Sequence, residues 1–254
     1  MNVLANGLLS PKWHVPANIV ARVTTRQGGV SVGNYTSFNL GAYVGDDRNH
    51  VIENRQRLAQ LIDSGIKLQW LNQVHGNRVI DAGKQSVFES ADAAYCRQPG
   101  IACCITTADC LPVFIASRNG DEVGLIHAGW RGLADGVVEN CLNAMKTAPD
   151  QCEVWLGPAI GPCHFEVGSE VRDRFLESAD SGQCQAISRC FIAAGTAGRY
   201  MADLYELTRI RLSAMGVASV SGGGLCTYCD EKNFYSFRVQ PVTGRMLSLI
   251  YLKP

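Results

Sequence analysis

The stretch Gly124-Leu-Ile-His-Ala-Gly-Trp-Arg-Gly132 carries the strongest indications of how this chain folds and what it does. An apolar, strand-like segment, residues 123–126, leads directly into His127. Ala-Gly and then Trp-Arg-Gly follow, so that the backbone is free to turn just after the histidine. A reactive side chain is typically presented in this way at the end of a strand, because loops on a rigid scaffold carry most functional residues.

Two other segments have the same setting. The run Gln-Val-His75-Gly follows one apolar segment, and the run Thr-Thr-Ala-Asp-Cys110 follows another. The separations along the chain are too long for one local zinc knuckle, but they suit a site assembled from three strand ends. Each residue alone is more often structural, and the shared setting is what favours a joint function. His75, Cys110 and His127 would offer two imidazoles and a thiol, a set able to hold zinc with one position left open.

The composition excludes several classes of protein. With 254 residues, 46% of them apolar, the chain can bury a large core, and we expect one domain spanning residues 1–254. Lys plus Arg and Asp plus Glu are equal at 23 each, so no overall charge favours nucleic acid or an anionic membrane. Residues 1–16 lack the continuous apolar core of a signal peptide, and no apolar run is long enough to span a bilayer. Together with an odd number of cysteines, 11, this predicts a cytoplasmic protein with mostly buried, reduced thiols.

Helical and strand periodicities alternate irregularly, which predicts an α+β fold with mixed β-sheets rather than a regular doubly wound fold. The expected helices run from Asp46 to Gly65 and over Leu133–Met145, Gly168–Leu176 and Met201–Met215. The expected strands are Ile19–Thr24, Leu68–Val74, Ile101–Thr106, Leu111–Ala116, Val123–Ile126, Glu153–Leu156, Ala186–Phe191, Ala218–Ser221 and Met246–Leu252.

Charged residues beside these turns are candidates for the same site. Asp109 could orient a ligand histidine, act as a general base or cap its turn. Arg131 could bind a phosphate or carboxylate with both arms of its guanidinium, or form a surface ion pair. Arg26 lies beside a Gly-Gly turn that could cradle an anion or be an ordinary hairpin.

Other cysteines carry weaker signals. Cys226-Thr-Tyr-Cys229 is a single C-x-x-C without a second pair, so a four-cysteine zinc site is unsupported. Cys163-His164 lies in a turn rich in Gly and Pro and could line a pocket or only shape it. Nucleotide-binding glycine motifs and the nucleophile elbow of hydrolases are absent, and five histidines could not supply the ligands of a multi-copper oxidase.

Taken together, the motifs resemble those of the YfiH family, also called the multicopper polyphenol oxidase or DUF152 family. The matching segments extend through nearly the whole chain. They are Thr25-Arg-Gln-Gly-Gly-Val-Ser31, Phe38-Asn-Leu-Gly41, Gly45-Asp-Asp47 with Asn54-Arg55, Gln73-Val-His-Gly76, Ser90-Ala-Asp-Ala93, Thr107-Ala-Asp-Cys-Leu-Pro112, His127-Ala-Gly-Trp-Arg-Gly132, Gly157-Pro-Ala-Ile-Gly161, Glu166-Val-Gly168, Cys226-Thr227, Phe234-Tyr-Ser-Phe-Arg238 and Thr243-Gly-Arg245.

The resemblance implies a layered sandwich of mixed β-sheets with flanking helices, a fold grouped with the cysteine deamidase domain of a bacterial toxin. It implies zinc held by His75, Cys110 and His127, and it leaves copper open as the metal. The family's activity is described as phosphorolysis of purine nucleosides, including adenosine, inosine and methylthioadenosine, with some adenosine deamination. Its older label is polyphenol oxidase, and some bacterial members are described as peptidoglycan editing factors.

Two functions follow from this resemblance. In a zinc-dependent purine nucleoside phosphorylase, the expected partners are a nucleoside and phosphate, with Arg26, Arg131 and Arg238 as phosphate contacts and Asn39 as a sugar or base contact. In a cysteine/zinc amide hydrolase acting on peptidoglycan precursors, Cys110 would be the nucleophile, with His127 or His75 as its base and bound zinc as either an activator or an inhibitor. Phosphate dependence separates the two. A third interpretation, a non-enzymatic metal-binding module, is disfavoured because a structural zinc normally has four protein ligands.

Overall fold

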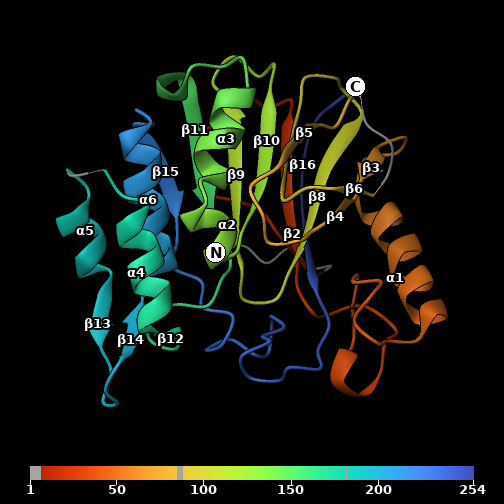
Figure 1. Cartoon of the computed structure of the whole chain (residues 1–254). Helices are drawn as coiled ribbons and strands as arrows, with labels where there is room; N and C mark the ends of the chain where they lie inside the picture. The colour runs from red at the N-terminus through yellow and green to blue at the C-terminus, as the bar shows by residue number, and fades with distance from the viewer. Residues whose placement is uncertain (1–6, 85–87, 181) are drawn as a thin grey trace.

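Two mixed β-sheets face each other at the centre of the molecule, and helices cover their outer faces (Figure 1). This computed structural model describes residues 7–84, 88–180 and 182–254, so the first six residues of the segment expected not to be a signal peptide lie outside it. The arrangement confirms the predicted α+β layered sandwich of mixed sheets with flanking helices.

The larger sheet has six strands in the order β15-β11-β9-β10-β7-β5. The bounds are β5 Val79–Asp81, β7 Ala93–Cys96, β9 Leu111–Ser117, β10 Val123–Ala128, β11 Cys152–Leu156 and β15 Ser219–Gly222. The pairs β5–β7 and β11–β15 are parallel and the others antiparallel.

The second sheet has five strands in the order β1-β2-β16-β8-β3, of which only β3 and β8 pair in parallel. The bounds are β1 Leu8–Leu9, β2 Ile19–Thr24, β3 Lys67–Gln69, β8 Ile101–Thr107 and β16 Met246–Leu252. Two small sheets complete the described strands: β4 Leu71–Asn72 with β6 Glu89–Ser90, and β12 Glu166–Gly168, β14 Arg199–Ala202 and β13 Phe191–Ala193.

The helices divide between the two outer faces (Figure 1). Helix α1 lies beside the five-stranded sheet, and the others lie on the side of the six-stranded sheet. Their bounds are α1 Arg48–Leu61, α2 Trp130–Ala134, α3 Val137–Ala144, α4 Ser169–Glu177, α5 Cys184–Arg189 and α6 Leu204–Ala214, with 3-10 turns at Gly33–Tyr35 and Pro149–Gln151. Within the described ranges, no helix is both long enough and apolar enough to cross a membrane.

Alternation along the central strands fills both sides of each sheet. On β9, Val113 and Ile115 face the helices while Phe114 faces the other sheet. On β16, Ile250 faces the six-stranded sheet while Leu249 packs on the side of α1. Because side chains point to opposite faces in turn and both faces are buried, these strands appear in the sequence as uninterrupted apolar runs.

Several predicted elements differ from the structure. The helix expected over Leu133–Met145 is two helices, because Gly136 adopts a left-handed conformation (φ 86°) between them. The helix expected from Met201 begins only at Leu204, where the Asp203 side chain accepts a hydrogen bond from a first-turn amide. The strand predicted over Ala186–Phe191 is wrong: most of it is α5, since a short apolar run cannot distinguish a strand from a buried helical turn.

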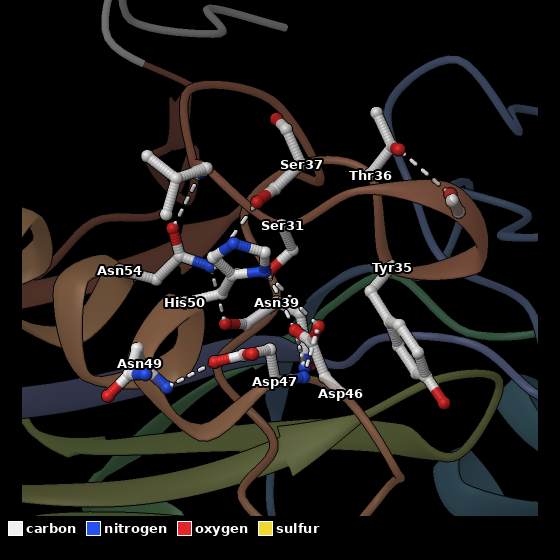
Figure 2. A network of polar contacts seen from close by, with 12 residues as sticks. Ser31, Tyr35, Thr36, Ser37, Asn39, Asp46, Asp47, Asn49, His50 and Asn54 are labelled. Carbon is white, nitrogen blue, oxygen red and sulfur yellow. Dashed lines mark hydrogen bonds and ion pairs between the residues drawn. The ribbon is translucent and has the colours of Figure 1, made fainter.

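A polar network anchors the long loop that precedes α1 (Figure 2). Asn54, fully buried on α1, accepts a hydrogen bond from the Val30 amide and donates to the carbonyl oxygens of Ser37 and Asn39. It also donates to the Ser31 hydroxyl, which donates in turn to Asp46. These bonds satisfy buried polar groups of an irregular segment, which explains how the loop keeps one shape without regular structure.

Candidate metal centre and its pocket

Antiparallel pairing brings two of the predicted ligands together. Strand β10 ends just where β9 begins, and His127 lies opposite Pro112 in the ladder. Cys110 immediately precedes β9, so its sulfur comes beside the His127 ring although the two residues are 17 positions apart in the sequence. The third residue, His75, lies in the loop between β4 and β5, and its ring centroid is 4.9 Å from that of His127.

The buried carboxylate of Asp92 joins the loop of His75 to the strand of His127. Asp92 precedes β7, which pairs with β10, and its Oδ1 atom lies 2.8 Å from His127 Nδ1. The backbone amides of Val74, His75 and Gly76 also donate to this carboxylate, at 3.2, 2.9 and 2.8 Å. Since a carboxylate only accepts, His127 carries its proton on Nδ1 and turns Nε2 toward Cys110.

The charges of the site reinforce each other. Burial opposes ionisation of Asp92, but hydrogen bonds from His127 and the loop amides lower its pKa below the ordinary value. Burial also disfavours a Cys110 thiolate, yet the charge of His127 and hydrogen bonds from both imidazoles lower the pKa of Cys110 to about 6. Against the effect of burial, Cys110 and Asp92 raise the pKa of His127 to about 9. The metal-free site therefore favours a thiolate next to an imidazolium.

Two glycines allow the close packing of this centre. A Cβ atom on Gly129 would lie 3.0 Å from the His75 ring and 3.2 Å from the Cys110 sulfur. A Cβ atom on Gly132 would come within 2.4 Å of the Gly76 carbonyl oxygen. The segment from Gly129 into α2 therefore approaches the candidate ligands and the loop of His75 as closely as only glycine permits.

The three residues could hold a metal ion. Their ligand atoms all lie within 4.8 Å of one another, while the burial of the residues ranges from exposed His75 to buried His127. They open into a cavity of about 440 Å³, within the range typical of small-molecule sites. Its walls combine three guanidinium groups with three aromatic rings: Arg131, Arg238, Arg245, Trp130, Phe165 and Phe237.

Of the predicted substrate residues, the structure brings two to this cavity and leaves two outside its lining. Arg131 and Arg238 line it. The Arg26 guanidinium instead donates to the carbonyl oxygens of Thr36 and Glu231. Asn39 is fully buried, and its amide bonds Gly41, Asp46 and Arg245 as part of the loop network (Figure 2).

Asp109 lines the cavity with both carboxylate oxygens already engaged. Oδ1 accepts from the Thr227 hydroxyl at 2.6 Å, and Oδ2 accepts from the Arg238 amide at 2.7 Å. Its backbone is left-handed (φ 85°), a conformation uncommon outside glycine and enriched in Asp and Asn. Asp109 thus fixes the segment that carries Arg238, whereas the carboxylate bonded to the candidate ligand His127 is that of Asp92.

Sequence reasoning assigned no role to Asp92, Gln73 or Arg245. Gln73 bonds both the amide and the carbonyl oxygen of Thr106, which joins the loop of His75 to the end of β8. Arg245 lines the cavity, and its guanidinium donates to two nearby carbonyl oxygens. The only available signal was that all three lie within the segments quoted for the family resemblance.

The fold and the site together describe this class of protein as a layered α+β sandwich in which two histidines and one cysteine line a pocket that also contains three arginines. A sequence profile for the multi-copper polyphenol oxidoreductase (laccase) family matches residues 20–253. A purine nucleoside phosphorylase of Pseudomonas aeruginosa is 48% identical over 98% of this chain and 99% of its own. The YfiH purine nucleoside phosphorylase of Escherichia coli is 45% identical over 96% of this chain and 98% of its own.

Solved structures agree with these relatives. A DUF152 protein of Neisseria meningitidis superposes with a TM-score of 0.91 at 41% identity, covering 98% of this chain and all of that one. YlmD of Geobacillus stearothermophilus gives a TM-score of 0.85 at 32% identity, with 98% and 100% coverage. The chain belongs to the multi-copper polyphenol oxidoreductase family, also called DUF152, as its motifs predicted.

Proposed function

We propose that this protein is a zinc-dependent purine nucleoside phosphorylase acting on adenosine, inosine and methylthioadenosine, with adenosine deamination as a side activity. The observation that carries the proposal is the pairing of an open metal-ligand set with an arginine-lined pocket of nucleoside size. Relatives that align with this chain over nearly their whole length are named purine nucleoside phosphorylases, which supports the same activity.

The donor set fits zinc. His75, Cys110 and His127 provide one sulfur and two nitrogens, and three protein ligands with a free fourth position are typical of catalytic zinc sites. The Asp92–His127 hydrogen bond is the arrangement that orients a ligand histidine and increases its basicity. When bound, zinc would supply Lewis acidity within the pocket. Copper is the alternative metal for the same ligands.

In phosphorolysis, a phosphate oxygen forms a bond to the anomeric carbon of the ribose while the bond to the purine nitrogen breaks. The bonding electrons leave with the purine, which takes up a proton. Arg131, Arg238 and Arg245 can bind the phosphate dianion, because a guanidinium presents paired donors to two oxygens. Trp130 and Phe165 offer apolar faces for the base, and Asp109 acts in this scheme by holding Arg238 in place.

The test is base release from inosine by the zinc-loaded protein, followed by chromatography with and without phosphate. Hypoxanthine released only with phosphate, together with ribose 1-phosphate, is the expected result. Arg131→Ala should raise the KM for phosphate. Replacing Arg57, a half-buried arginine outside the pocket lining that pairs with Glu53 on α1, by Ala should leave it unchanged. A phosphate-independent release of base, or an Arg131→Ala variant with unaltered phosphate dependence, would contradict the scheme.

One observation favours a second candidate, a cysteine amide hydrolase acting on peptidoglycan precursors. The Cys110 sulfur lies within 4.8 Å of a ring nitrogen of both His75 and His127, and this contact, which lowers the pKa of Cys110, is the setting of a thiolate nucleophile. This activity would need no phosphate and would be greatest in metal-free protein. Release of an amino acid from a muropeptide by chelator-treated enzyme, with no base released from nucleosides, would support it over phosphorolysis.

A further inference from the structure

A second cluster of metal-ligand residues lies outside the candidate active site. Cys163 and His164 come from the loop between β11 and β12, and Cys226 and Cys229 come from the segment after β15. One ligand atom from each, three sulfurs and one ring nitrogen, lies within 4.8 Å of the other three. The two segments are 62 residues apart from His164 to Cys226, so only the tertiary fold brings them together.

The spacing of these atoms suits a tetrahedral zinc ion. Zinc–sulfur bonds of about 2.3 Å place two thiolates of a tetrahedral site about 3.8 Å apart. Cys163 and Cys229 are 3.6 Å apart between their sulfurs, and His164 Nδ1 lies 3.0 and 3.4 Å from those two atoms. The ring of His164 is stacked on Tyr228, with centroids 3.9 Å apart, which fixes the orientation of its Nδ1 atom.

We propose that Cys163, His164, Cys226 and Cys229 bind a zinc ion in a closed, four-ligand site that is separate from the one formed by His75. Three cysteines and one histidine are a donor set of structural zinc sites. A disulfide would use only two of the three sulfurs and would leave the imidazole without a role. The fourth ligand, Cys226, also accepts a hydrogen bond from the Gly161 amide at 3.2 Å, a bond of the kind that orients ligand thiolates.

Such a zinc ion would hold one wall of the active-site pocket. Thr227, between the two cysteines, donates to Asp109, and the His164 carbonyl oxygen accepts from the Arg238 guanidinium at 3.1 Å. Phe165, next to His164, lines the pocket. The ion would therefore tie together two irregular segments that already meet at the isolated bridge between Ala159 and Cys226 and at the Gly161–Cys226 hydrogen bond. Its role is structural, since all four positions around it are filled by protein.

The test is thiol protection in the whole chain. Metal-free, reduced protein is alkylated with and without added zinc, and the modified peptides are quantified by mass spectrometry. Zinc should protect Cys163, Cys226 and Cys229 at least tenfold. Cys184, a partly exposed cysteine outside both clusters, should react equally under the two conditions.

Metal content gives an independent readout. Zinc-loaded wild-type protein should contain two ions per chain, one for each cluster. The Cys110→Ser variant and the Cys226→Ser variant should each contain one ion. His164→Cys, which keeps four ligands, should retain both ions, and Cys184→Ser should match the wild type. Cobalt bound to the Cys110→Ser protein should give the intense sulfur-to-metal absorption of three thiolates.

Three results would overturn the proposal. One is wild-type protein whose single zinc ion is lost in Cys110→Ser. Another is equal alkylation of Cys163 with and without zinc, a measurement that stands even if Cys226→Ser fails to fold. The third is a Cys163–Cys229 disulfide that is found in protein purified without reductant and that persists when the protein is treated with reductant and zinc. None of these depends on phosphorylase activity, so the second site can fail while the proposed function stands.

Discussion

Replacing Asp92 with asparagine is expected to disrupt the candidate metal centre, although Asp92 is not itself one of the three candidate ligands. The carboxylate is fully buried and accepts four hydrogen bonds, three from consecutive backbone amides and one from His127. An asparagine side chain has one acceptor oxygen, and its amino group would face donors instead of accepting from them. Two of the four donors therefore lose their partner.

The size of the effect follows from that count. Each buried donor left without an acceptor costs about 1–3 kcal/mol, so Asp92→Asn should lose about 2–6 kcal/mol of stability. The change also removes the anion that holds the proton on His127 Nδ1. Loss of a partner that orients a metal-ligating histidine typically weakens metal binding by about 10–100-fold.

Two assays measure these effects separately. Urea unfolding of the metal-free protein gives the loss of stability, and competition with a zinc chelator gives the change in affinity. Asp173→Asn is the matched control, because its carboxylate is exposed and lies 3.4 Å from the neighbouring Arg172. If Asp92→Asn bound zinc as tightly as the control and unfolded at the same urea concentration, the role assigned to Asp92 would be refuted.

Three further predictions follow from the geometry. Gly129→Ala should weaken zinc binding in a chelator competition more than it lowers stability, because the added Cβ would press against the ligands; equal affinity would contradict this contact. In metal-free protein, iodoacetamide should modify Cys110 at a rate that rises as the pH passes about 6, since only the thiolate reacts. The reaction of Cys110→Ser protein gives the background to subtract. A rise near the ordinary thiol pKa of about 8.5 would refute the pairing of Cys110 with His127. Tyr205→Phe should lose about 1–3 kcal/mol in urea unfolding, because its buried hydroxyl bonds Ala159 and Leu225; an unchanged midpoint would disagree.

Local patterns were sufficient to find the central strands and the three metal-ligand candidates. The strands β8, β9, β10 and β16 are buried on both faces, so each appears in the sequence as a continuous apolar run that can be recognised without knowing its pairing. Of the candidate ligands, His127 lies near the end of β10 and Cys110 directly precedes β9, while His75 lies in the loop between β4 and β5; all three are next to turns, a local feature. Short edge strands were missed because their pairing depends on neighbours far along the chain. The helix α5 was predicted as a strand because a short apolar run does not distinguish the two. That residues 1–254 form one domain stays a prediction.

The sequence by itself determined which residue types stand at the strand ends, because those positions follow from local periodicity and turn chemistry. Only the tertiary structure decided which of them meet. The antiparallel register of β7, β10 and β9 placed Asp92 and Cys110 on either side of His127. The loop network kept Asn39 away from the pocket lining, and the approach of two irregular segments joined Cys163 to the C-x-x-C pair. These contacts depend on how elements far apart in the sequence pack together, and a local sequence pattern contains no information about that packing.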